Sequence, residues 1–587
     1  MKKLLFTLVT CVLLFSIPAA ALASSAPPAV RTAPAQEQPL AHLTPLTRYF
    51  PSGSVAYAAL RTDDAFIDTL DGVLQRMVRV LPPDALPVPP AFLNARFLLG
   101  LAAVEVFGNN FDMAVRPWLG GSIAVGVYPL DYLYDIDWSK TTLMPLVVAA
   151  EITSQEGAVA ALDTLVERNV LRNFEKEEMP DYTLYRQIVH PRAEAFMVRD
   201  DVLLYAASQA FLPLDGAFAR SLAQDRDFEA TLSLLPAESY NVLAYLNTPR
   251  LLAAMFGQMR RGEGLQYLPY VRMIGGTAIG ATILDDNSLT LDIVQRDGNQ
   301  ALRNALGLMG GPTTAINPAF ANLLPANAVV AMQITNIEEQ WDRARANLGA
   351  LVNAAVLQAP DNPFGANAVD SILRPINLMT IAFTGLDYER DLANWMRSDA
   401  LFFAGLNMAL LPDYVPIDFA FVHAAAAPDP SRQLFDTLAT EVPLTLLAAG
   451  AQGVSTAEEV IEGADALVIN VQQIYDPSLE LIFAVSDDLA IFGTRAAVAH
   501  VLSADRETPL PAVAEAQRAL LPGSSTAGYL FPPALLTLEA LLPDSRSRAE
   551  VGAVLQIVGG LVPSATFSTV VTDGNDMLLR LVLTLAD

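Results

Sequence analysis

Two stretches decide the fold, FPSGSV at residues 50–55 and LPANAV at residues 324–329. Each joins a Pro turn to an apolar strand, a polar cap and a helix. Similar elements continue in the same order, from Leu43 to about Gly298 and from Pro318 to Asp587. A repeat of roughly 260 residues is a whole domain rather than a solenoid unit. The sequence therefore predicts an internal duplication with two homologous tandem domains.

Further anchors recur in order in the two copies. They are Gly108 and Trp118 with Gly385 and Trp395; Asp131-Tyr132 with Asp413-Tyr414; Leu162-Asp163-Thr164-Leu165 with Phe435-Asp436-Thr437-Leu438; Asp200-Asp201 with Asp487-Asp488; and the closing hairpins at residues 281–287 and 568–574. Within each copy, the segments from Leu235 and from Leu521 also resemble the opening units. This second similarity is either an older duplication or a common local arrangement of Leu-Pro, strand, cap and helix.

Short strands joined by Asp, Asn and Gly turns alternate with amphipathic helices. One such helix is predicted over Asp63–Val80, with an Asp cap and its apolar residues on one face. Hairpins with intervening helices predict an α+β fold in which each domain has a largely antiparallel sheet with packed helices. The predicted organisation is a signal peptide at 1–23, a disordered Pro-rich tether at 24–42, a first domain at 43–298, a linker with a short helix at 299–317 and a second domain at 318–587.

The amino terminus has the pattern of a signal peptide. Lys2 and Lys3 precede an apolar core at residues 4–17, and Ala21-Leu22-Ala23 is a small-residue cleavage site. We expect cleavage near Ala23 and an extracytoplasmic mature protein. A lipoprotein signal at Cys11 is the rival interpretation, although Cys11 lies inside the apolar core. Cleavage also removes the only cysteine, so the mature chain is cysteine-free, without disulfide or thiol chemistry.

The amino-acid composition limits the classes of partner that the protein can bind. After cleavage, 34 basic residues face 63 acidic ones, and this negative charge opposes nucleic acids and anionic lipid surfaces. No later apolar run reaches the eighteen or so residues that span a bilayer, so no transmembrane helix is predicted in the mature chain. With 52% apolar residues, the chain can bury two sizeable cores.

The sequence contains few recognisable catalytic motifs. Neither Lys140 nor Lys176 lies in a phosphate-binding loop or a Ser-x-x-Lys motif. The segments at residues 453–457 and 523–527 only approach a Gly-x-Ser-x-Gly elbow and are interpreted as turns. Four histidines are scattered singly, without the spacing of a zinc pair, at His42, His190, His423 and His500. No catalytic, cofactor-binding or metal-binding residue is assigned.

One loop combines carboxylates with aromatic side chains. Its residues are Asp131, Tyr132, Tyr134, Asp135, Asp137 and Trp138. Carboxylate oxygens suit calcium and aromatic faces suit sugar rings, so this loop is a weak candidate for a cation or ligand. It lacks the Gly and Glu of a calcium-binding loop, and a solvated acidic loop is the simpler interpretation. Asp200-Asp201, Asp285-Asp286 and Asp487-Asp488 are interpreted as turns, and the run at residues 175–178 as solvent-facing.

Trp118 and Trp395 hold equivalent places in the two copies, each preceding an apolar strand. We interpret both as structural anchors of their domains. The opening units, the segment at residues 116–121 and the Asp-Asp turns resemble the bacterial exported family known as domain of unknown function 3352. This resemblance covers most of the mature chain and implies no activity and no functional residue.

Two functions from different classes remain. The sequence favours a non-catalytic exported protein that binds or scaffolds an unknown envelope or extracellular ligand through a cleft between its domains or an apolar surface. The alternative is a carboxylate-dependent hydrolase acting on a cell-envelope polymer. A cluster of acids present in only one copy would favour the hydrolase.

Overall fold

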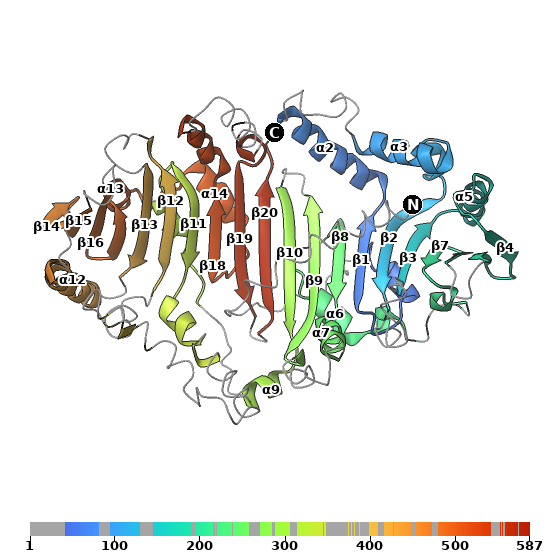
Figure 1. Ribbon diagram of the computed structural model, residues 1–587, viewed down its shortest axis with the longest axis horizontal. Helices are drawn as coiled ribbons and strands as arrows, with labels where there is room; N and C mark the ends of the chain where they lie inside the picture. Colours follow the sequence, from blue (N-terminus) through green and yellow to red (C-terminus); the bar gives the residue numbers. More distant parts are fainter. Residues whose placement is uncertain are drawn as a thin grey trace. The chain divides into compact units, whose positions relative to one another are not determined.

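The computed structural model describes residues 42–80, 94–128, 145–188, 194–257, 271–283, 288–305, 314–347, 398–408, 416–448, 454–471, 479–541 and 558–586. Nine residues inside these ranges are not described: 215, 217, 219, 238, 344, 426, 427, 573 and 574. Seven single residues outside the ranges are described: 374, 377, 378, 381, 387, 552 and 555. The described residues form two compact units, one up to Asn299 and one from Gln300 (Figure 1). Each unit is described by itself.

The first unit contains one antiparallel sheet in which sequence neighbours are often not spatial neighbours. Its strand order is β4-β5-β6-β7-β3-β2-β1-β8-β9-β10. The strands are β1 (Ala56–Arg61), β2 (Leu119–Val127), β3 (Leu146–Ile152), β4 (Phe174–Glu178), β5 (Thr183–Gln187), β6 (Ala195–Arg199), β7 (Val202–Ala206), β8 (Val242–Leu246), β9 (Ile274–Ile283) and β10 (Ser288–Asp297). Buried residues alternate along β2 and β9, as the period of two of a strand requires.

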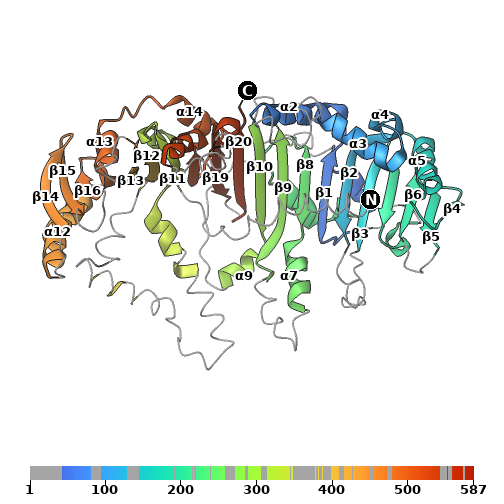
Figure 2. The same cartoon turned by 45° about the horizontal axis from the view of Figure 1, so that its top comes forward.

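Helices of the first unit pack on this sheet. They are η2 (Pro45–Tyr49), α2 (Asp64–Val80), α3 (Ala95–Phe107), α4 (Phe111–Ala114), α5 (Gln155–Glu167), η6 (Gln209–Phe211), η7 (Leu222–Gln224), α6 (Arg226–Leu232) and α7 (Thr248–Gly257). The carboxylate of Asp63 caps α2 by accepting a hydrogen bond from the Phe66 amide, at 3.0 Å. The helices α2, α3 and α5 lie over one face of the sheet (Figure 2). Their side chains share one buried core with those of β3, β5 and β6.

The second unit has the strand order β14-β15-β16-β17-β13-β12-β11-β18-β19-β20, again wholly antiparallel. The strands are β11 (Ala328–Ile334), β12 (Ala400–Leu406), β13 (Ile417–Ala424), β14 (Val454–Ile461), β15 (Ala464–Val471), β16 (Leu479–Val485), β17 (Leu489–Thr494), β18 (Thr526–Leu530), β19 (Ser564–Val571) and β20 (Met577–Thr584). This order is the same as that of the first unit when β1 is matched with β11 and β10 with β20.

The helices of the second unit are α9 (Gln300–Ala305), η10 (Pro318–Leu323), α12 (Pro428–Ala448), α13 (Arg495–Ser503), α14 (Pro511–Arg518) and η15 (Pro532–Leu541). Successive side chains of β16 point to opposite faces of the sheet. Accordingly, Ile482 and Ala484 join the core that includes α13, whereas Phe483 and Val485 join a second cluster with Leu434 of α12. Helices therefore cover both faces of this strand.

The predicted α+β class with largely antiparallel sheets is confirmed. The helix predicted over Asp63–Val80 is α2, with Asp63 as its cap. The predicted signal peptide and almost all of the predicted tether lie outside the described residues.

Among the described helices, none combines the length and the apolar character needed to cross a membrane.

Candidate functional site

A short helix places two polar side chains beside the sheet of the first unit. Pro45 begins η2, and Leu46 and Tyr49 turn their side chains into the core. Arg48, one position before Tyr49, is half-exposed. The guanidinium of Arg48 lies 4.9 Å from the centre of the Tyr49 ring, a cation–π distance. This single turn thus presents a cation and a phenol together.

The hairpin turn between β6 and β7 supplies two carboxylates. Arg199 pairs with Val202 across the hairpin, which leaves Asp200 and Asp201 as the turn. Asp200 has a positive φ of 38°, a conformation that Asp tolerates better than most residues. The carbonyl of Asp201 accepts a hydrogen bond from the Ile152 amide at 2.9 Å, which ties the turn to the end of β3. The predicted Asp-Asp turn therefore also has a fixed position.

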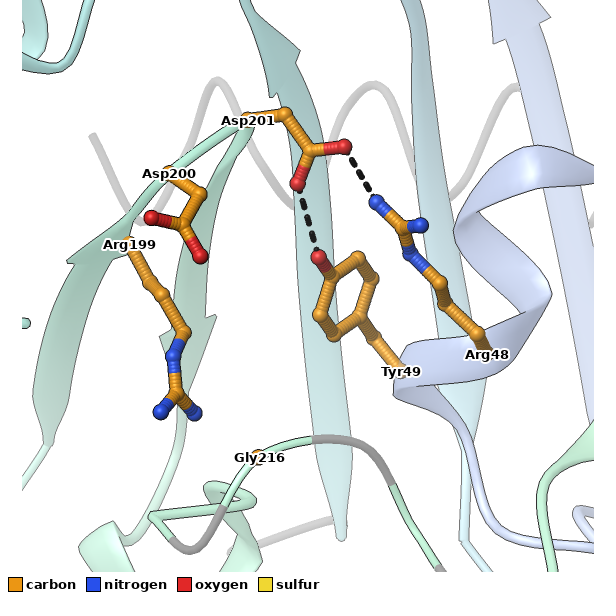
Figure 3. A pocket seen from close by; sticks show the side chains of 6 residues that line it. All are labelled: Arg48, Tyr49, Arg199, Asp200, Asp201 and Gly216. Atoms are coloured by element: carbon orange, nitrogen blue, oxygen red, sulfur yellow. Dashed lines mark hydrogen bonds and ion pairs between the residues drawn. The ribbon is translucent and has the colours of Figure 1, made fainter. Parts of the chain in front are cut away.

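Asp201 joins the turn to η2 (Figure 3). Its Oδ1 accepts a hydrogen bond from the Tyr49 hydroxyl at 2.9 Å, and its Oδ2 pairs with Nη2 of Arg48. Burial alone would raise the pKa of Asp201, but the hydrogen bond from Tyr49 and the charge of Arg48 outweigh burial and lower it. Burial and the bond to Asp201 raise the pKa of Tyr49 to about 12. The ionised form of Asp201 is thus favoured, and Arg48 compensates its negative charge.

Arg199, the last residue of β6, is only partly engaged. Its side chain is 16% exposed, and its Nη2 lies 3.9 Å from the exposed carboxylate of Asp181. Its guanidinium lies 5.8 Å from the centre of the Tyr182 ring. Its Nη1 is buried without a hydrogen-bond partner among the described residues and points toward Gly216 (Figure 3). An unsatisfied buried donor of this kind is unusual and lowers the free energy of unfolding by about 1–3 kcal/mol.

These side chains surround an open depression of about 640 Å³ in the first unit. Its lining residues are Arg48, Tyr49, Arg199, Asp200, Asp201 and Gly216. Two cations and two carboxylates balance each other in this lining. The arrangement offers hydrogen-bond donors and acceptors, which suit recognition of a polar ligand.

The corresponding turn of the second unit is built differently. Asp487 and Asp488 form the turn between β16 and β17, and Arg506 pairs with Asp488, its Nη2 at 3.3 Å from Oδ1. This hydrogen-bonded pair lowers the pKa of Asp488 against the opposing effect of burial. Ser486 stands at the place of Arg199, and Leu323 ends η10 where Tyr49 ends η2. Both units therefore have the acidic turn, but the phenol and the partly engaged arginine belong to the first.

The predicted ligand loop does not belong to the described part of the chain. Asp131, Tyr132, Tyr134, Asp135, Asp137 and Trp138 lie outside the described residues, as do Trp395, Asp285, Asp286 and His190. Within the described part of the chain, no group of three or more His, Cys, Asp or Glu side chains could hold a metal ion. The acidic run at residues 175–178 forms β4, in which Lys176 pairs with Asp163 at 3.0 Å.

Sequence reasoning missed Arg48, Tyr49, Arg199 and Gly216. Two signals were present: Arg199 directly precedes the Asp-Asp turn, and Tyr49 stands two residues before Pro51 of the opening unit. Neither signal says that η2 and this turn meet, because the contact joins residues 152 positions apart.

Removal of the Tyr49 hydroxyl tests the contact between η2 and the turn. In Tyr49→Phe we expect the free energy of unfolding to fall by about 1–2 kcal/mol, because Asp201 loses a hydrogen-bond donor in a partly buried place. Urea denaturation of the full chain measures this change. Tyr182→Phe is the matched control, since the Tyr182 ring lies near Arg199 without a hydroxyl hydrogen bond in the described structure. Equal stability losses in both variants would contradict the assigned role of Tyr49.

Fold and site together define an α+β protein with antiparallel sheets and a polar, charge-balanced depression in its first unit. Residues 103–438 match the family described as "Protein of unknown function (DUF3352)". The match covers more than half of the chain, so the chain belongs to this family, as the sequence resemblance predicted. It begins within α3 and ends within α12. A search of curated proteins found no match.

Proposed function

We propose that the protein is an exported, non-catalytic binding protein built from a duplicated domain, and that the depression of the first unit receives its ligand. Export is supported by the basic start, apolar core and small-residue cleavage site of residues 1–23. Duplication is supported by the ordered sequence anchors and by the shared order of ten strands in the described sheets. Asp200 and Asp487 occupy matching turns in that order.

The state of Asp201 is the observation that favours binding over catalysis. A general base or acid works best when its pKa lies near the working pH. Asp201 instead accepts a hydrogen bond from Tyr49 and pairs with Arg48, and its pKa is lowered from an already acidic value. A carboxylate held in this way is a poor proton donor and a weak base, but together with the buried Tyr49 it fixes the half-exposed Arg48 in a preorganised position for recognition.

A carboxylate-dependent hydrolase of an envelope polymer remains the alternative. Glycoside hydrolysis ordinarily requires two carboxyl groups, one of which must be protonated. Of the two carboxylates in the depression, Asp201 is neutralised by Arg48, which leaves only Asp200 for such chemistry. The acidic turn also recurs in the second unit, so the acids themselves are not a feature of one copy. The geometry therefore supports the hydrolase less well.

The test uses protein recovered from the extracytoplasmic fraction, with its amino terminus sequenced. We expect a mature terminus near Ser24 and a small polar molecule released on denaturation, detected by mass spectrometry. We also expect that incubation with envelope polysaccharide releases no soluble fragments. In Arg199→Gln the captured molecule should be lost, whereas Arg186→Gln, on β5 and paired with Glu177 at 3.6 Å, should retain it. Fragment release that disappears in Asp200→Asn would overturn the binding proposal in favour of the hydrolase.

A further inference from the structure

Two groups in the depression of the first unit lack partners among the described residues. The carboxylate of Asp200 has neither an ion pair nor a side-chain hydrogen bond. Nη1 of Arg199 is a donor without an acceptor. Figure 3 shows Asp200 and Arg199 on the same side of the depression, opposite the Tyr49–Asp201–Arg48 cluster. A ligand that satisfies both groups must accept a hydrogen bond and donate one.

The charges around the depression select among such ligands. Arg48 pairs with Asp201 and Arg199 lies beside Asp181, so a negative charge on the ligand would find no free cation among the described residues of the depression. The whole chain has a formal net charge of −27, which further opposes an anionic ligand. A neutral ligand with many hydroxyl groups meets these conditions, because each hydroxyl both donates and accepts hydrogen bonds.

We propose that the depression binds a neutral carbohydrate, one hydroxyl accepting from Arg199 and another donating to Asp200. The proposal rests on the binding function proposed above and names its ligand class. A volume of about 640 Å³ lies within the range of small-molecule sites. Turning Nη1 of Arg199 from Gly216 toward the ligand breaks no hydrogen bond of Nη1, since Nη1 makes none in the described structure. The same rotation moves Nη2 away from Asp181, but that contact is long, at 3.9 Å, and its carboxylate is exposed, so its loss costs little.

Of the two acidic turns that the structure describes, the same reasoning assigns a site only to that of the first unit. In the second unit, Ser486 replaces Arg199, and Asp487 lies at the tip of its turn, 98% exposed and 3.5 Å from Arg432. Leu323 cannot supply the hydroxyl that Tyr49 contributes in the first unit. The acidic turn of the second unit thus lacks the partly engaged donor on which the proposal depends.

Isothermal titration calorimetry of the full chain tests the proposal, with cellotriose, maltotriose and the trimer of N-acetylglucosamine as neutral probes. The dipeptide glycylglycine is the zwitterionic comparison, because an ammonium could pair with Asp200 and a carboxylate with Arg199. We expect at least one trisaccharide to bind with one site per chain. Arg199→Gln and Asp200→Asn should each weaken binding about tenfold, the loss of roughly one hydrogen bond to a charged group. Arg186→Gln and Asp487→Asn, matched in chemistry but not among the residues that line the depression, should bind as the parent does.

The possible outcomes separate the inference from the proposed function. Absence of saturable binding to all three trisaccharides overturns the carbohydrate inference, and so does equal weakening in the control variants. Binding of glycylglycine alone also overturns it but leaves a binding function in place. Release of new reducing ends from a bound trisaccharide supports the carbohydrate site and overturns the non-catalytic function.

Discussion

Replacement of Trp118 by alanine is expected to lower the free energy of unfolding of the first unit by about 3–5 kcal/mol. Trp118 is 8% exposed and precedes β2 in a core cluster that also contains Ile152, Leu162 and Phe196. Its indole Nε1 donates a hydrogen bond to the carbonyl of Ala114 at 2.8 Å, so the polar atom of the ring is satisfied. Truncation would remove this bond and leave a large cavity between β3, β6 and α5.

The packing around Trp118 leaves little room for collapse into that cavity. A Cβ built on Gly157 would lie 2.9 Å from the Cβ of Trp118, so α5 already approaches the Cβ that an alanine at position 118 would keep. Thermal unfolding measures the overall loss, and hydrogen exchange should show it in peptides of β2, β3 and α5. Met113→Ala, in the neighbouring α4 but 67% exposed, should change stability by less than about 0.5 kcal/mol. If Trp118→Ala retained parental stability, Trp118 would not be a structural anchor.

Local structure was largely predictable from the sequence because it depends on local chemistry. The Asp cap and apolar face of residues 64–80 predicted α2, and the Asp200-Asp201 pair between apolar runs predicted a turn. The order of strands could not be predicted in the same way. In the first unit β1 lies between β2 and β8, and β3 lies beside β7, so these pairings depend on the packing of segments far apart in sequence.

The candidate site was less predictable than the fold for the same reason. Tyr49 and Arg48 precede an unremarkable turn, and only the tertiary structure brings them to Asp201. Asp418 shows that burial, too, depends on the tertiary structure. Its acidic side chain is buried and accepts hydrogen bonds from Thr494 and Asn407, at 3.1 and 2.7 Å, although sequence alone suggests a surface residue. The identity of a residue therefore did not reveal its environment.

Acidification is expected to destabilise the second unit through His423. This histidine lies in β13, its side chain is 1% exposed, and its Nε2 accepts a hydrogen bond from the Ser398 amide at 3.3 Å. Burial lowers the pKa of His423 to about 4. Protonation of Nε2 would place a positive charge in the core. It would also set the new N–H of the ring against the N–H of Ser398, and two donors cannot form a hydrogen bond with each other. The neutral ring is therefore the form that fits the folded unit.

The direction and range of the pH effect follow from proton binding. In the unfolded chain His423 takes up a proton near pH 6.5, whereas in the folded unit it does so only near pH 4. The contribution of neutral His423 to the free energy of unfolding is therefore fully present above pH 6.5. It is lost as the pH drops toward 4, and it changes little further below that value. The difference in pKa corresponds to about 3 kcal/mol. The carboxylates with lowered pKa, such as Asp201 and Asp488, lose their contributions at lower pH, below the ordinary aspartate value.

Denaturant unfolding of the full chain at pH 7, 5.5 and 4 measures this loss, and hydrogen exchange should locate it in peptides of β12 and β13. His423→Gln keeps a hydrogen-bond acceptor for the Ser398 amide but cannot be protonated in this range, so the decline between pH 6.5 and 4 should shrink by most of its size. A smaller decline should remain from His500, whose pKa burial also lowers. His42→Gln, at an exposed position of the first unit, should behave as the parent. An unchanged decline in His423→Gln would show that another group causes the acid sensitivity.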